Sequence, residues 1–180
     1  MMRRDVETGI IPECYVDTNL TETLTGFVCN HQKGCANVAK QMQEKRSDQF
    51  ALGIIDKDKR PVRYLSEFEL IARNDYLEVH KHKSRPHYII YIIPAVEGFV
   101  LKAAEEVGVS LSDFCLPNDL ESLKRQTKQQ DSKKDVRFKK LFMAIKESSA
   151  MRVLQEIVVY LKENQYTAEV EIIKSSLMDK

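Results

Sequence analysis

The segment FALGIIDKDKR, residues 50–60, decides the fold. Residues 50–55 form an almost unbroken apolar run of the length of one β-strand. A strand that is apolar on both faces is typical of a parallel sheet covered by helices on both sides. Asp56 and Asp58 follow the run directly. Because functional groups gather in loops at the carboxyl ends of parallel strands, these aspartates mark the first candidate site.

Strand and helix patterns alternate on both sides of this segment. We expect further strands at residues 10–16, 27–30, 76–80 and 88–93, and helices at 18–24, 34–45 and 66–73. This alternation predicts an α/β fold in which residues 1–94 form a parallel sheet with right-handed crossovers, flanked by helices. Pro12 cannot donate to a strand ladder, so the first strand either ends at Pro12 or begins at Glu13.

Only helical patterns follow the last predicted strand. Pro94 suits the first turn of a helix, and an apolar stripe continues to Val107 before Gly108 closes it. We therefore expect residues 95–180 to form a helical C-terminal extension packed on the core.

The composition limits the choice of partners and compartment. Lys and Arg number 28 and Asp and Glu 27, a net charge of +1, which argues against a chain-wide basic surface for nucleic acid. No apolar run reaches the roughly 18 residues of a membrane span, so no membrane partner is expected. The N-terminal residues lack an apolar stretch behind their charges, which predicts a cytoplasmic protein with reduced thiols at its four cysteines.

Two groups of acids stand near predicted strand ends. Glu13 and Asp17 lie in IPECYVDTNL, and Asp56 and Asp58 follow the buried run. Carboxylate oxygens are the ligands that Mg²⁺ prefers, and clustered acids repel one another unless a cation joins them. A D-x-D motif is also common in plain turns, which is the structural alternative.

Taken together, these motifs resemble the Toprim domain, the catalytic module of topoisomerases, DnaG-type primases and OLD-type nucleases. That family has a glutamate near the end of its first strand, often within E-G-x-x-D, and a D-x-D motif after a third strand. Residues 13–17 and 56–58 stand in the same order, with Cys14 where glycine is usual. The resemblance covers residues 10–94.

The resemblance implies a site and a reaction. Asp56 and Asp58 would hold Mg²⁺ or Mn²⁺, and Glu13 would act as a general acid/base or as a further ligand. Asp17 and Glu97 are additional candidate ligands, although an acid in the first turn of a helix, such as Glu97, is also favoured by the helix dipole alone. The implied activity is nucleic-acid cleavage by phosphoryl transfer.

Basic residues supply candidates for binding DNA or RNA. Lys57, Lys59 and Arg60 adjoin the predicted metal site, and residues 120–147 carry nine basic and four acidic side chains. Within that stretch we expect Lys133, Lys134 and Arg137 to contact a phosphate backbone. Few aromatic residues accompany these lysines, so stacking of single-stranded bases has little support there.

Two other interpretations stay open. Residues 15–19, YVDTN, are similar to the start of a PIN-type ribonuclease, whose first strand ends in an acid corresponding to Asp17. The chain could also be a catalytically inactive Toprim-like binding or regulatory protein. The sequence leaves homo-oligomer formation open.

Overall fold

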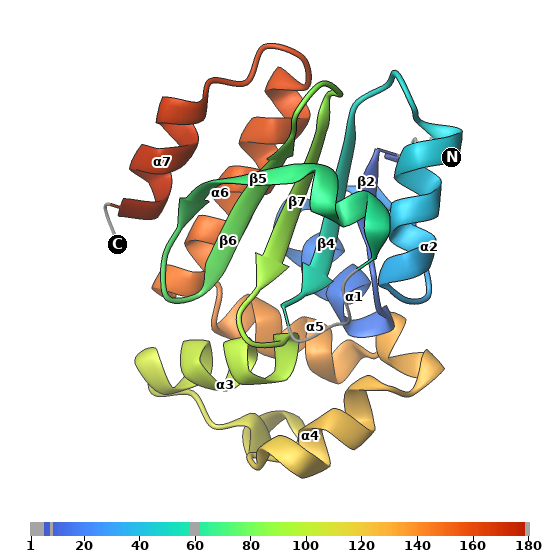
Figure 1. Cartoon of the computed structure of the whole chain (residues 1–180). Helices are drawn as coiled ribbons and strands as arrows, with labels where there is room; N and C mark the ends of the chain where they lie inside the picture. The colour runs from blue at the N-terminus through green and yellow to red at the C-terminus, as the bar shows by residue number, and fades with distance from the viewer. Residues whose placement is uncertain (1–5, 8, 58–61, 179–180) are drawn as a thin grey trace, which may run out of the picture.

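A mixed five-stranded sheet with helices on both faces forms the centre of the computed structural model, which describes residues 6, 7, 9–57 and 62–178 (Figure 1). The strands are β1 (Val6–Glu7), β2 (Ile10–Pro12), β3 (Val28–Cys29), β4 (Ala51–Asp56), β5 (Phe68–Arg73), β6 (Leu77–His82) and β7 (His87–Ile92). The helices are α1 (Tyr15–Thr25), α2 (Cys35–Lys40), α3 (Val96–Glu106), α4 (Leu120–Thr127), α5 (Val136–Ala144), α6 (Ser149–Asn164) and α7 (Val170–Met178). Short helical turns span Gln41–Lys45, Arg63–Glu67, Leu111–Phe114 and Gln130–Lys133.

The order of the strands in the sheet is β2-β4-β7-β6-β5. All six residues of β4 are buried, as the apolar run predicts, and β4 lies parallel to both β2 and β7. β6 and β5 are antiparallel additions, so the prediction of an all-parallel sheet is wrong for these two strands. The expected helix at 66–73 is also wrong, because this segment pairs with β6 as strand β5 after the turn Arg63–Glu67.

The strand predicted at residues 10–16 is β2 and ends at Pro12. The helix that follows, α1, begins at Tyr15 rather than at the predicted residue 18. The Glu13 N–H donates to Ile54 O at 2.9 Å. In a parallel strand, the N–H groups of successive residues point alternately to the two neighbouring strands. Because the Glu13 N–H points to β4, the Pro12 nitrogen points away from β4. The pairing of β2 with β4 therefore loses no hydrogen bond at Pro12. Cys14 is the N-cap of α1, with its Sγ accepting from the Asp17 N–H at 3.4 Å. The chain thus turns from strand to helix directly at Glu13.

The chain crosses from one side of β2 to the other. The Asn30 N–H donates to Ile10 O at 2.9 Å, so the segment after β3 lies beside β2. The next strand, β4, pairs with β2 on its other side. Such a reversal of strand order leaves a crevice at the carboxyl ends of the two strands, which is where α/β proteins place their ligands.

Two layers of helices cover the sheet. One apolar cluster joins alternate residues of the strands to α1, α3, α5, α6 and α7, and the second joins the other residues to α2 and the turn after it. The helices α3 and α4 lie below the carboxyl ends of β4 and β7 (Figure 1). In the part of the chain that the structure describes, no helix is both long and apolar enough to cross a membrane.

Gly53 in the middle of β4 allows α2 to approach the sheet closely. A Cβ atom there would lie 2.6 Å from Ile89 Cδ1 and 3.0 Å from Val38 Cγ1. We expect Gly53→Ala to lower the free energy of unfolding by about 1–3 kcal/mol, the usual cost of overpacking a core. Urea unfolding measures this change. Gly98→Ala on α3 is the control, because its Cβ would meet only Pro94 at 3.4 Å and should raise stability slightly. Equal stabilities of the two variants would contradict the close packing of α2.

Candidate functional site

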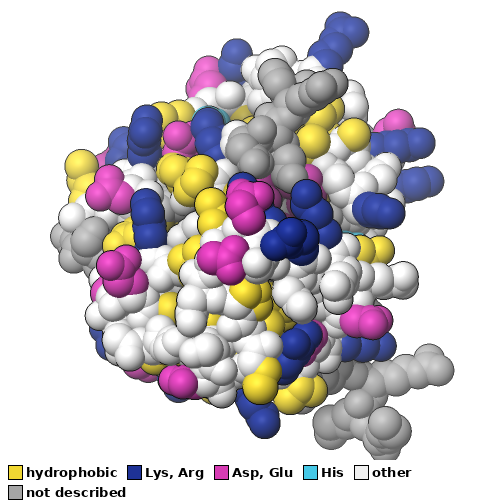
Figure 2. All heavy atoms as spheres, turned by 90° about the horizontal axis from the view of Figure 1, so that it is seen from below, with side chains coloured by type: hydrophobic (Ala, Val, Ile, Leu, Met, Phe, Trp, Pro, Cys, Tyr) yellow, Lys and Arg dark blue, Asp and Glu magenta, His cyan; other side chains and the backbone are white. Residues whose placement is uncertain are grey.

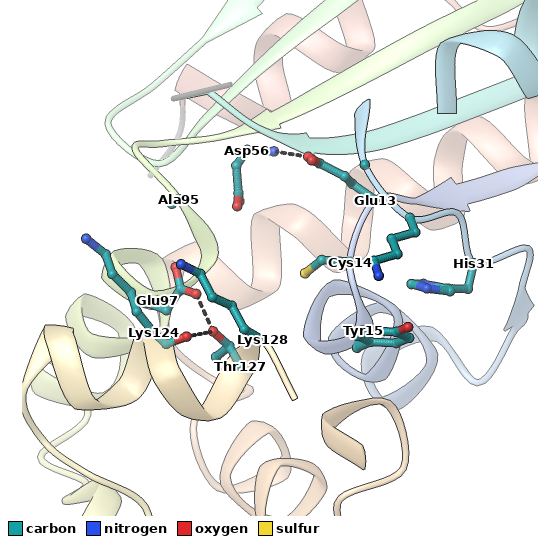
Figure 3. Close-up of a pocket in the computed structure, with 12 residues that line it drawn as sticks. Glu13, Cys14, Tyr15, His31, Asp56, Ala95, Glu97, Lys124, Thr127 and Lys128 are labelled. Atoms are coloured by element: carbon teal, nitrogen blue, oxygen red, sulfur yellow. Dashed lines mark hydrogen bonds between the residues drawn. The ribbon is translucent and has the colours of Figure 1, made fainter. Parts of the chain in front are cut away.

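A cavity of about 300 Å³ opens at the crevice between β2 and β4 (Figure 3). It is bounded by the residues that follow these strands, by the start of α3 and by one side of α4. Its lining residues are Glu13, Cys14, Tyr15, His31, Lys33, Gly34, Asp56, Ala95, Glu97, Lys124, Thr127 and Lys128. Acids and lysines from separate parts of the chain therefore face one space.

Glu13 and Asp56 meet at the deep end of this cavity. The Asp56 N–H donates to Glu13 Oε2 at 3.3 Å, and the Val96 N–H donates to Asp56 Oδ1 at 2.9 Å. Both side chains are 5% exposed. Asp56 thus sits at the N-terminal end of α3, where the helix dipole stabilises a negative charge. The structure brings together these two acids, which the sequence places 43 positions apart.

Glu97 lies across the cavity from Asp56 (Figure 3). It is in the first turn of α3, and its Oε1 accepts a hydrogen bond from the Thr127 hydroxyl at the end of α4. This bond ties α4 to α3 and fixes the wall of the cavity that carries Lys124 and Lys128. Glu97 therefore has a structural role here in addition to its place in the candidate site.

Asp17 lies beneath the cavity rather than in its wall. The side chain is fully buried on α1, and neither carboxylate oxygen has a hydrogen-bond partner among the described residues. The pKa of Asp17 is raised to about 7, because burial and then the charges of Glu13 and Glu97 raise it by more than the hydrogen bond with Cys14 lowers it. In turn, burial and the charge of Asp17 raise the pKa of the Cys14 thiol well above its ordinary value. Both groups thus hold their protons more tightly than they would in water.

The donor chemistry of this cavity suits a hard cation, and the geometry supplies part of a binding site. Within residues 6, 7, 9–57 and 62–178, no three His, Cys, Asp or Glu side chains are gathered closely enough to hold a metal ion. Mg²⁺ usually takes only one or two carboxylates and completes its shell with water and substrate phosphate. Glu13 and Asp56 fit that requirement. The predicted third ligand, Asp58, lies outside the described residues, as do Lys59 and Arg60.

Three lysines also line the cavity. Lys33 follows β3, and Lys124 and Lys128 lie one turn apart at the end of α4. The spacing of Lys124 and Lys128 places both on one helix face, and this spacing is the signal that sequence reasoning passed over in favour of the basic run further on. Lys33 offers no such signal.

The remaining predicted basic residues have other surroundings. The Lys57 Nζ lies 2.6 Å from Glu78 Oε2 and 4.6 Å from the ring centre of Tyr91, so it is held against the neighbouring strands. The Arg137 Nη2 lies 2.7 Å from Asp135 Oδ2, and the same guanidinium donates to the Cys115 carbonyl. Both side chains lie outside the cavity wall.

Lys133 and Lys134 line a second hollow that shares Tyr15 and His31 with the first. Figure 2, seen from the end of the molecule on which α4 lies, shows Lys and Arg side chains beside Asp and Glu over this face rather than one continuous basic patch. The basic side chains of this face are therefore interspersed with acidic ones.

Comparisons with protein-family models, curated proteins and solved structures found no match for this chain. Its function has to be argued from the geometry of the cavity.

Proposed function

We propose that this protein is a Mg²⁺-dependent phosphoryl-transfer enzyme that cleaves nucleic acid at a site of Toprim type. The observation that carries the proposal is the hydrogen bond from the Asp56 N–H to Glu13 Oε2, 3.3 Å long, between the ends of two adjacent parallel strands. Glu13 and Asp56 match, position by position, the family's first glutamate and the first acid of its D-x-D motif. Cys14 departs from the usual glycine, and as N-cap of α1 it suits a helix that starts directly behind the glutamate.

The acids would divide the chemistry between them. Asp56, together with Asp58, would hold Mg²⁺ or Mn²⁺, which when bound stabilises negative charge on a phosphate. Glu13 would take a proton from the attacking water as the water oxygen bonds to phosphorus and the phosphodiester P–O bond breaks. The leaving oxygen then takes a proton from solvent.

The lysines give this site its substrate class. Lys33, Lys124 and Lys128 share a cavity with the acids, and their ammonium groups suit the oxygens of a phosphate that the acids alone would repel. A cation at the acids and the ammonium groups in the same cavity would together hold a phosphodiester.

The free energy that it costs to bury these acids supports the same function. Glu13, Asp56 and Glu97 line one cavity and are 5–8% exposed, and burying neighbouring carboxylates is unfavourable while they are charged. Folded proteins keep such strain mostly at functional sites. A cation bound between Glu13 and Asp56 would offset part of this repulsion.

One observation favours the alternative of a catalytically inactive binding protein. The described residues hold no ready cluster of three metal-ligating side chains. An inactive protein of this fold would bind nucleic acid through its lysines without binding Mg²⁺.

Metal titration tests the proposed function. We expect the protein to bind Mn²⁺, measured by calorimetry, and Asp56→Ala to weaken this binding at least tenfold, because it removes a charged ligand from a buried site. The matched control is Asp48→Ala, which removes an exposed acid near the opposite end of β4. A protein that binds no Mn²⁺, or one in which both variants bind equally, would support the inactive alternative. Mg²⁺-dependent nicking of DNA or RNA by the wild type completes the test.

A further inference from the structure

The second hollow has a volume of about 710 Å³ and adjoins the cavity that Glu13 and Asp56 line, which we call the carboxylate cavity. The walls of the two share the rings of Tyr15 and His31. The rest of its wall comes from the turn between α4 and α5: Gln130, Asp131, Lys133 and Lys134. A linear ligand that lay in both hollows would therefore pass over the two rings.

The two rings form a fixed platform. Tyr15 and His31 are stacked, with ring centres 4.6 Å apart and planes 21° from parallel. The Thr18 hydroxyl donates to the Cys14 carbonyl at 2.8 Å, so its oxygen accepts from His31 Nδ1–H at 2.9 Å. This arrangement places the imidazole proton on Nδ1 and leaves a lone pair on Nε2, which has no hydrogen-bond partner in the described part of the chain. Burial and the charge of Lys133 lower the pKa of His31, which keeps the ring neutral at pH 7.

The turn that carries the two lysines beside the rings is also held in place. The Asn19 side chain on α1 donates to the Ser132 and Asp135 carbonyls at 2.8 and 3.1 Å. These bonds fasten the turn that carries Lys133 and Lys134 to the helix that carries Tyr15. Two ammonium groups against the single acid Asp131 give this hollow a positive balance.

We propose that a single strand of DNA or RNA runs from the carboxylate cavity over the Tyr15–His31 pair, with a base stacked on the rings and the adjoining phosphates at Lys133 and Lys134. The proposal rests on the proposed function and specifies its substrate. Aromatic rings beside lysines are the usual means of binding single strands, because every unpaired base has a face that can stack. A duplex keeps its bases stacked inside and cannot present one to these rings.

Fluorescence anisotropy with labelled 12-nucleotide probes tests this path in EDTA, where no metal-dependent cleavage occurs. The probes are single-stranded DNA, single-stranded RNA and a DNA duplex of the same sequence, and a preference between the first two identifies the natural strand. We expect single strands to bind more tightly than the duplex. Tyr15→Leu should weaken single-strand binding about 5- to 100-fold, the range that loss of one stacked base produces. Tyr15→Phe keeps the ring and should bind like the wild type.

The matched controls lie elsewhere on the surface. Tyr166→Leu removes a tyrosine that is 64% exposed and should leave affinity unchanged. The double variant Lys133→Ala/Lys134→Ala should reduce the slope of log K against log salt by about 1.4, the contribution of two phosphate contacts on a single strand. Lys174→Ala, on α7, which lies away from α4 at the other end of the molecule, should leave that slope unchanged (Figure 1).

The outcomes separate this proposal from the proposed function. Equal affinities of Tyr15→Leu and Tyr166→Leu for single strands overturn the path, even where Asp56-dependent nicking is observed. Loss of affinity in Tyr15→Leu in a protein that neither binds Mn²⁺ nor cleaves supports the path and overturns the enzyme. Failure of all probes to bind overturns the path, whereas Mn²⁺ binding and Mg²⁺-dependent nicking decide separately whether the protein is an enzyme.

Discussion

Glu13→Gln is expected to lower the rate of metal-dependent cleavage about 10³-fold. Glutamine has nearly the same shape, and its side-chain oxygen can still accept the Asp56 N–H, so the two strand ends stay connected. The substitution removes the charge that attracts a cation and the group that takes a proton. Such contributions amount to several kcal/mol, and each 1.36 kcal/mol is a factor of ten in rate. Nicking of a labelled strand under single-turnover conditions measures the loss.

Glu22→Gln on α1 is the matched control for this experiment. Glu22 also accepts a backbone N–H, that of Cys29 at 2.9 Å, but it does not line the carboxylate cavity. Its variant should cleave like the wild type. If Glu13→Gln and Glu22→Gln cleaved equally fast, Glu13 would have no part in the reaction.

The free energy of unfolding of Asp17→Asn is expected to fall less with rising pH than that of the wild type. The folded pKa of Asp17, about 7, lies above its ordinary value of 3.8, so the folded state holds a proton that the unfolded chain releases. The stabilisation that this bound proton contributes is fully present below pH 3.8 and is lost as the pH rises through the folded pKa, about 7. At 1.36 kcal/mol per pKa unit, the stability of Asp17→Asn relative to wild type should rise by about 2–3 kcal/mol between pH 5 and pH 8.

Urea unfolding at pH 5 and pH 8 measures this difference, with the exposed Asp48→Asn as a control that should follow the wild type at both pH values. An unchanged difference between Asp17→Asn and wild type would show that Asp17 does not hold a proton in the folded state.

The same variant addresses the PIN-type alternative. Under the proposed function Asp17→Asn keeps Mn²⁺ binding, whereas loss of binding there and its retention in Asp56→Ala would favour a PIN-type site.

Part of the candidate site was predictable because its residues stand next to strong local patterns. Asp56 follows the apolar run 50–55 and is the last residue of the buried strand β4, and Glu13 directly follows Pro12, the last residue of β2. Parallel neighbours bring their carboxyl ends to the same edge, which explains why the two acids meet. Glu97 was a candidate only through the resemblance to Toprim-like nucleases, several of which carry a further acid beyond the D-x-D motif.

Other features depend on tertiary contacts that no local pattern records. The segment 66–73 contains good helix formers, yet pairing with β6 makes it a strand, since strand formation depends on neighbours more than on intrinsic preference. Tyr15 and His31 are separated from Lys133 and Lys134 by about two thirds of the chain, so the absence of aromatics near those lysines in sequence was misleading. Only the docking of α1 on the turn before α5 brings them together.

A crystal of the full chain soaked in Mn²⁺ tests the central claim most directly, because the anomalous signal locates the ion without assumptions about its ligands. The account predicts one strong peak in the cavity, within roughly 2 Å of carboxylate oxygens of both Glu13 and Asp56. No peak at saturating Mn²⁺, or a peak that neither of these side chains contacts, would contradict it.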